Sequence, residues 1–141
     1  MFFKNRKIIS VILFSFSLSL LFASPSKGQK VIDLTKLNQI MLYTQVYNMV
    51  WTPEEFRGTY VKIKGKFYSS VNPEDNKTYY AVVVSDMAGC CMAGLDFVLG
   101  PSLEGQTLPS GECNIEVHGT YVISMMNGFE YPHIEADFVS Y

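Results

Sequence analysis

The dipeptide Asn127-Gly128, which lies between two stretches that alternate in hydropathy, constrains the fold more than any other feature of the chain. Asn-Gly is the strongest short signal for a two-residue β-hairpin turn, because both residues tolerate the positive φ that such a turn requires. With this pair as the turn, apolar residues meet on one face and polar residues on the other: Val117 with Phe138, Gly119 with Ala136 and Tyr121 with Ile134, against Thr120 with Glu135 and His118 with Asp137. The sequence therefore predicts strands over 114–126 and 129–141, with His118 and Asp137 as a cross-strand polar pair.

Three further strands are predicted before this hairpin. From Thr59 the apolar positions recur every second residue and alternate with lysines, which is typical of a half-buried strand: Val61, Ile63, Gly65 and Phe67 against Lys62, Lys64 and Lys66. Residues 79–85 and 95–99 are also predicted to be strands. Residues 72–76 form a turn, and residues 100–111 form a loop that contains two prolines and three glycines.

Five strands, with a glycine inside both the first and the fourth (Gly65 and Gly119), favour a mainly β fold. We expect a five-stranded β-barrel of the oligonucleotide/oligosaccharide-binding (OB) type with one N-terminal helix. OB barrels usually carry a helix between the third and fourth strands, where this chain has the loop, so the N-terminal helix would cover the end of the barrel. The alternatives are an open antiparallel sheet with the helix packed across it and another small β-barrel.

A single N-terminal helix is predicted over residues 33–51. Asp33 or Thr35 is suited to cap its start, and Thr52-Pro53 ends it, because proline cannot continue a helix and restricts the residue before it. One face at helical spacing is mostly apolar and is expected to enter the core: Leu37, Ile40, Met41, Thr44, Tyr47, Asn48 and Trp51.

Residues 1–28 have the pattern of an export signal, and residues 29–141 are expected to form one domain. A basic start is followed by an apolar run over 8–22 and by small residues, with a cleavage position after Ala23. The protein is therefore expected to be exported to the periplasm or beyond the cell. The alternative is an uncleaved anchor, which would be the chain's contact with the membrane.

The charges of the chain are unevenly distributed. The last basic residue is Lys77, and residues 78–141 contain eight carboxylates and no Lys or Arg. Such a surface repels phosphate backbones, so nucleic acid is disfavoured as a partner. A cation, a basic peptide or a neutral ligand fits this charge better, although acidic residues also serve solubility.

The segment 86–94 contains the adjacent cysteines Cys90 and Cys91 between two glycines. Thiolates bind Zn²⁺ and Cu(I), so a metal site is one role open to the pair, with further ligands drawn from Asp86, Met87, Met92 or Cys113. The Cys-x₂₋₄-Cys spacing of common zinc sites is absent. The two histidines, His118 and His133, are predicted to face outward, roughly 13 Å apart along the hairpin, which is too far to share one ion.

Two other roles are open to these cysteines. A bridge between neighbouring residues is strained, because a trans peptide holds their Cα atoms about 3.8 Å apart, whereas bridged pairs usually lie about 4.4–6.8 Å apart. A structural role is one alternative: one of the two cysteines could form an ordinary disulfide bridge with Cys113, or both could be buried thiols with no chemical role. Redox chemistry is the last alternative, although the Cys-x-x-Cys spacing of thiol oxidoreductases is missing.

The segment Pro53–Gly58 before a Val-Lys-Ile-Lys-Gly strand, together with Cys90-Cys91 before Gly94-Leu95-Asp96-Phe97, resembles a family of exported bacterial proteins of unknown function. The resemblance covers most of residues 33–141 and implies a helix followed by an OB-like barrel; it implies no activity. The Cys-Cys strand end is also similar to one in a bacterial family of permease-associated proteins linked to zinc supply.

No nucleophile elbow, phosphate loop or His-Glu-x-x-His motif is present, so we expect a binding protein rather than an enzyme. The sequence favours an exported module that binds a small ligand, a metal ion or an envelope protein through the Cys90-Cys91 loop. One alternative is a thiol- or metal-dependent envelope protein with zinc or copper. The other is a structural envelope component.

Overall fold

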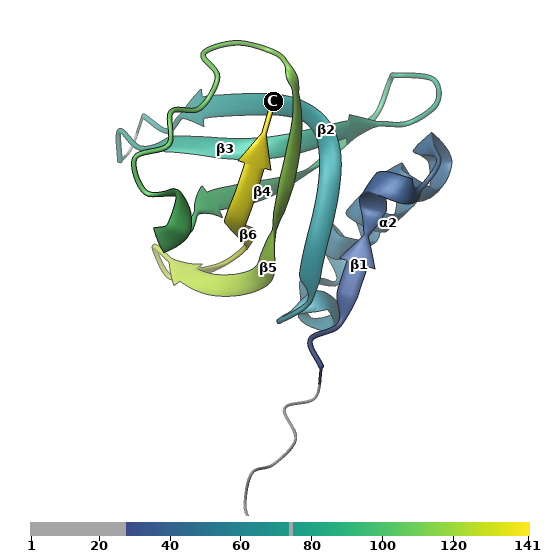
Figure 1. The fold of residues 1–141 in the computed structure, drawn as a ribbon, viewed down its shortest axis with the longest axis horizontal. Coiled ribbons are helices and arrows are strands. Elements are labelled where there is room, and N and C mark those ends of the chain that lie inside the picture. Colours follow the sequence, from purple (N-terminus) through teal and green to yellow (C-terminus); the bar gives the residue numbers. More distant parts are fainter. Residues whose placement is uncertain (1–27, 74) are drawn as a thin grey trace, which may run out of the picture.

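Six strands and one α-helix make up residues 28–73 and 75–141, the part of the chain that the computed structural model describes (Figure 1). The strands are β1 (Val31–Asp33), β2 (Tyr60–Val71), β3 (Thr78–Ser85), β4 (Met92–Leu99), β5 (Asn114–Met126) and β6 (Phe129–Ser140). The helix is α2 (Gln39–Trp51). The described chain also has three short 3-10 helices, η1 (Leu34–Lys36), η2 (Pro53–Phe56) and η3 (Pro101–Leu103). The prediction of a mainly β fold with one helix is confirmed.

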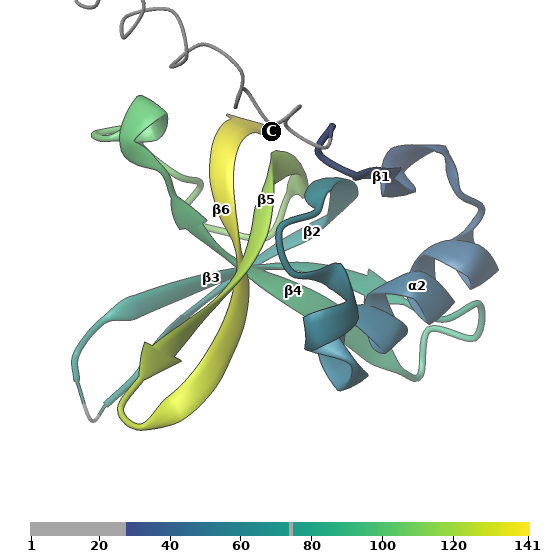
Figure 2. The same ribbon diagram turned by 90° about the horizontal axis from the view of Figure 1, so that it is seen from below.

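The six strands belong to one sheet in the order β1-β2-β3-β4-β6-β5, and β2 also pairs with β5. Following the pairings from β2 through β3, β4, β6 and β5 therefore returns to β2, and Figures 1 and 2 show these strands curled around a common interior. The β4–β6 and β1–β2 pairings are parallel and the others antiparallel. The alternative of an open, purely antiparallel sheet does not fit this arrangement.

The final hairpin has the predicted turn and most of the predicted register. Asn127 adopts a φ of 52° and Gly128 a φ of 85°, and facing pairs run as predicted from Met126–Phe129 to Gly119–Ala136. An irregularity between His118 and Gly119 then shifts the register by one residue, so Val117 faces Val139 rather than Phe138. A β-bulge of this kind adds twist where a strand bends sharply, and alternation in hydropathy carries no signal for it.

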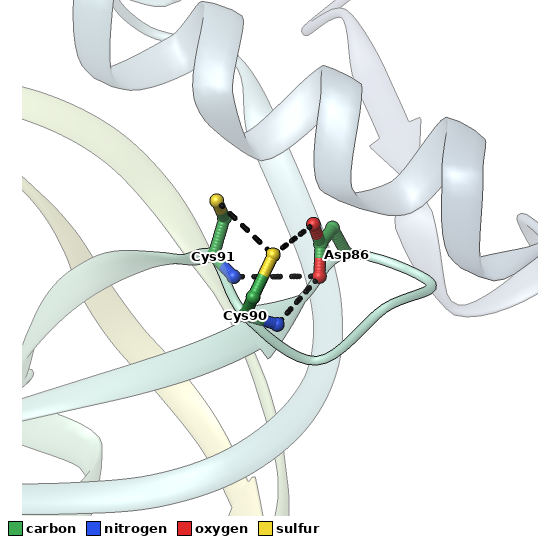
Figure 3. Close-up of side chains that lie close together, drawn as sticks. All are labelled: Asp86, Cys90 and Cys91. Carbon is green, nitrogen blue, oxygen red and sulfur yellow. Dashed lines mark hydrogen bonds between the residues drawn. The ribbon is translucent and has the colours of Figure 1, made fainter.

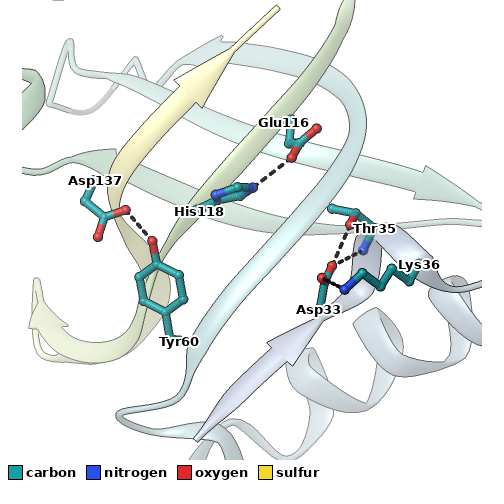
Figure 4. A network of polar contacts seen from close by, with 7 residues as sticks. All are labelled: Asp33, Thr35, Lys36, Tyr60, Glu116, His118 and Asp137. Atoms are coloured by element: carbon teal, nitrogen blue, oxygen red, sulfur yellow. Dashed lines mark hydrogen bonds and ion pairs between the residues drawn. The ribbon is translucent and has the colours of Figure 1, made fainter. Parts of the chain in front are cut away.

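The predicted pair of His118 and Asp137 is therefore wrong. His118 faces Phe138 and stacks on its ring, and its Nε2 atom lies 2.8 Å from Oε1 of Glu116 on the same strand. Asp137 instead accepts a 2.7 Å hydrogen bond from the hydroxyl of Tyr60 on β2 (Figure 4). Burial and this carboxylate raise the pKa of Tyr60 to about 12.

The predicted helix over 33–51 is divided in two, and the strand β1 before it was missed. Asp33 does act as a cap, but of η1: its carboxylate accepts hydrogen bonds from Thr35 and pairs with Lys36 at 2.9 Å (Figure 4). The Thr35 and Lys36 bonds hold the pKa of Asp33 at about 2. Asn38 then starts α2 by accepting from the backbone N–H of Met41 at 3.0 Å. Asp33 therefore caps η1 and Asn38 caps α2, so two separately capped helices occur where one continuous helix was predicted.

The helix α2 packs against β4 and β3 with a different face from the one predicted. Val46 and Met49 are fully buried, whereas Ile40, Tyr47 and Trp51 are exposed. The segment Gln39–Trp51 contains no Asp, Glu, Lys, Arg or His, so its sequence does not mark a solvent-facing side. Tertiary packing decides the orientation, and it leaves a second apolar face uncovered.

The expected export signal falls on residues 1–28, which lie outside the described residues except for Gly28. In the part of the chain that is described, every helix is too short or too polar to cross a bilayer.

Candidate functional site

The loop from Asp86 to Cys91 joins β3 to β4 beside the first turn of α2 (Figure 3). The backbone N–H of Asp86 donates to the carbonyl of Cys91 at 2.9 Å, which closes the loop, and Gly89 supplies a φ of 71° at its tip. From the helix, the Gln39 side-chain amide donates to the carbonyl of Asp86 at 2.8 Å. The loop is thus held by its own backbone and by α2.

The carboxylate of Asp86 arranges the cysteine pair. Its Oδ1 atom accepts from the backbone N–H groups of Cys90 at 3.1 Å and Cys91 at 3.4 Å. Its Oδ2 atom accepts from the Cys90 thiol at 3.4 Å. One carboxylate oxygen therefore shapes the turn while the other lies against a sulfur atom (Figure 3).

The two thiols lie close together, with 3.7 Å between the Sγ atoms of Cys90 and Cys91. Both cysteines are exposed, and one donor atom from each of Asp86, Cys90 and Cys91 lies within 4.8 Å of the others. A tetrahedral zinc ion with Zn–S bonds of about 2.3 Å and a Zn–O bond of about 2.0 Å separates two sulfur ligands by about 3.8 Å and a sulfur from an oxygen by about 3.5 Å. The two sulfur atoms, at 3.7 Å, and the Cys90 sulfur with Oδ2 of Asp86, at 3.4 Å, already lie close to these separations.

The electrostatics of the loop favour a cation over an additional anion. Hydrogen bonds with Cys91 and Asp86, together with the charge of Asp86, raise the pKa of the Cys90 thiol. For Asp86, burial acts to raise the pKa, but hydrogen bonds from the Cys90 thiol and from the backbone N–H groups of the loop together lower it. At neutral pH an ionised carboxylate therefore lies beside a protonated thiol whose proton a metal ion can replace.

The other predicted ligands are two methionines and Cys113. Met92 begins β4 next to Cys91 and, like Met87 in the loop, is highly exposed. Cys113 is half-buried against the core just before β5 and does not belong to the donor group found among the described residues. All three cysteines are free thiols in the described chain, so the alternative of a bridge to Cys113 is not realised.

The histidines contribute nothing to this loop. His133 was predicted to face outward, but it is 8% exposed, stacks on Tyr131 and bonds through Nδ1 to the Tyr131 carbonyl at 3.0 Å. Both histidines lie on the final hairpin rather than on the β3–β4 loop.

Two neighbours of the loop had no signal in the sequence. Gln39 donates a hydrogen bond to the carbonyl of Asp86. Burial raises the pKa of Tyr43 on the next helical turn, and negative charge on Cys91 and Asp86 raises it further. Both residues approach the loop only because α2 packs across β3 and β4, a placement that local periodicity does not specify.

Apart from the cysteine loop, a cleft lies between the β2–β3 and β5–β6 hairpins, which extend to the same side of the molecule in Figure 2. It is a cleft of about 300 Å³ with Tyr68, Tyr79 and Tyr80 on its walls and Asp96 at one side. The Tyr79 hydroxyl already donates to Asp75 at 2.6 Å, and burial raises the pKa of Asp96. Aromatic walls of this kind suit a ligand that stacks, whereas the group of metal-ligating side chains found among the described residues lies at the cysteine loop.

No family model matches the chain, and no curated protein matches it. The chemistry of the loop is accordingly inferred from its own donor atoms, which are two thiols and one carboxylate oxygen.

Proposed function

We propose that the protein is an exported binding module that holds a thiophilic divalent cation, with zinc as the best fit, in the Asp86–Cys91 loop. Two thiolates, from Cys90 and Cys91, and Oδ2 of Asp86 would be the ligands. The observation that carries the proposal is the 3.7 Å separation of the two Sγ atoms, which equals the edge of a tetrahedral thiolate site within about 0.1 Å. The Cys90 sulfur therefore already lies near the ligand separation from both the Cys91 sulfur and Oδ2 of Asp86.

Zinc is favoured over copper because of the third donor. Thiolates bind both Zn²⁺ and Cu(I), whereas a carboxylate oxygen is a harder ligand that suits zinc better than Cu(I). Asp86 is ionised and lies 3.4 Å from the Cys90 sulfur, so its charge favours a divalent ion at this position. A copper site would draw instead on the thioethers of Met87 and Met92, which are both exposed.

A redox role for the vicinal pair is the second candidate, supported by the exposure and proximity of the two thiols. Two features make it the weaker one. A bridge between adjacent residues is strained at a trans peptide, and the described residues contain no cis peptide bond. Reactive cysteines also have lowered pKa values, whereas the pKa of Cys90 is raised.

We further propose that the closed circuit of strands is an OB-type barrel. The support is the strand order, in which β4 and β6 pair in parallel while β2 joins β3 on one side and β5 on the other. Only the short helix η3 occurs between β4 and β5, and α2 packs on β3 and β4 from outside. Export and a position in the cell envelope follow from the signal pattern of residues 1–28 and belong to the same proposal.

The proposal is tested by titrating the purified, reduced protein with zinc against a coloured chelator at several pH values. We expect saturable binding whose apparent affinity rises about tenfold per pH unit for each thiol proton released, between about pH 6 and about pH 8. Zinc would also protect Cys90 and Cys91, but not Cys113, from alkylation. Absence of saturable binding, or binding that leaves both loop thiols open to alkylation, would rule out the site.

A further inference from the structure

Three donors leave one position of a tetrahedral ion unfilled. Among the described residues, no fourth His, Cys, Asp or Glu belongs to the group formed by Asp86, Cys90 and Cys91. Both cysteines are exposed, so the open position is accessible to a ligand from outside the chain. A structural zinc site is normally closed by four protein ligands, whereas an open position is typical of a catalytic site.

Apart from the Asp86 carboxylate of the loop, large apolar side chains surround the open position. Met87 is 70% exposed and Met92 is 75% exposed on the loop itself. The uncovered face of α2 continues this surface through Ile40 and through the row Tyr43, Tyr47 and Trp51, whose neighbouring ring centroids lie 6.2 Å and 5.8 Å apart. Tyr43 connects the two parts, because it lies within electrostatic range of Cys91 and Asp86.

We propose that a second copy of this chain completes the site, so that one zinc ion joins two loops through four thiolates, the Cys90–Cys91 pair of each copy. The inference rests on the two thiolate ligands of the proposed function and names the partner, whose two thiolates take the place of Asp86 on the ion. The four thiols lose their protons to solvent on binding. Oδ2 of each Asp86 leaves the ion, while Oδ1 keeps its hydrogen bonds to the backbone N–H groups of Cys90 and Cys91.

Two observations favour a second copy over a different partner. First, each chain offers two sulfur atoms that are already separated by one edge of the tetrahedron, so two copies supply the complete Cys₄ set. Second, a two-fold interface brings the same patch of both copies together, so a patch with an excess of one sign of charge would repel its own copy. The residues of α2 include no Asp, Glu, Lys, Arg or His, so two copies can meet along this helix without like-charge repulsion.

The test is light scattering with size-exclusion chromatography of the purified protein, with and without zinc, combined with the zinc content of each peak. We expect a monomer without metal and a dimer with one zinc per two chains. Ile40→Lys, which places a charge on the exposed face of α2, is expected to weaken zinc-dependent dimerisation at least about tenfold without removing a ligand. Cys113→Ser, which removes a thiol outside the donor group, is expected to dimerise with zinc as the parent does.

The outcomes separate this inference from the proposed function. A monomer that binds one zinc per chain, with affinity reduced by Asp86→Asn, would overturn the dimer and leave the three-donor site standing. A dimer that forms equally without zinc, or that survives Cys90→Ser with Cys91→Ser, would also overturn it. Absence of zinc binding in any state would remove both proposals together.

Discussion

Replacing Cys90 and Cys91 together by serine is expected to lower zinc affinity by more than about 100-fold, beyond the loss typical of removing a residue that only supports the ligands. Serine keeps the size and the backbone of the loop but removes both sulfur donors. Because both side chains are exposed, the free energy of unfolding without metal should change by less than about 0.5 kcal/mol. The measurement is a competition titration of the reduced parent and variant proteins.

Two matched variants make this result specific to the loop. Cys113→Ser removes the third thiol, which lies outside the donor group, and Met92→Leu removes the thioether next to Cys91 at the start of β4. Both are expected to bind zinc as the parent does. Equal loss of binding in Cys113→Ser, or unchanged binding in the double serine variant, would contradict the assignment of the ligands.

Gly119→Ala is expected to lower the free energy of unfolding by about 3 kcal/mol or more, the upper range for an overpacked interior position. A Cβ atom at Gly119 would lie 2.1 Å from the carbonyl oxygen of Glu135 and 2.7 Å from the Cα atom of Ala136 on β6. Both neighbours are backbone atoms of the paired strand, so they cannot turn away as a flexible side chain would. Relief requires the β5–β6 hairpin to separate at its bulge.

Urea denaturation followed by circular dichroism measures this effect. Gly111→Ala is the control, because a Cβ atom there would meet nothing within 4 Å and Gly111 does not have a positive φ. The control is expected to unfold within about 0.5 kcal/mol of the parent. If Gly119→Ala were as stable as Gly111→Ala, the close approach of β5 and β6 would be wrong.

The strands could be predicted where side-chain alternation and turn chemistry agree. The bounds 114–126 match β5, and the Asn127-Gly128 turn and eight facing pairs follow from the same pattern. The bulge beyond Gly119 could not be predicted, since an extra residue in one strand is set by the curvature of the sheet rather than by hydropathy. The predicted orientation of α2 was wrong for a related reason. The residues of α2 are uncharged on every side, so packing against β3 and β4 selects the buried face.

The candidate site follows the same division between local and long-range information. Cys90, Cys91 and Asp86 are close in sequence, and a short loop brings their donor atoms together, so the trio could be named from the residues alone. The pair of His118 and Asp137 depends on strand register, and the register changes at the bulge, so these two residues do not face each other in the structure. The contact of Gln39 with Asp86 depends on how α2 packs against the sheet, so the local sequence does not predict it.

The central claim, that thiolates of the β3–β4 loop bind the ion, is tested most directly by X-ray absorption at the zinc edge of the zinc-loaded protein. The account predicts at least two sulfur neighbours at about 2.3 Å, and four if two copies share the ion. A first shell of oxygen and nitrogen atoms alone, at about 2.0 Å, would contradict it.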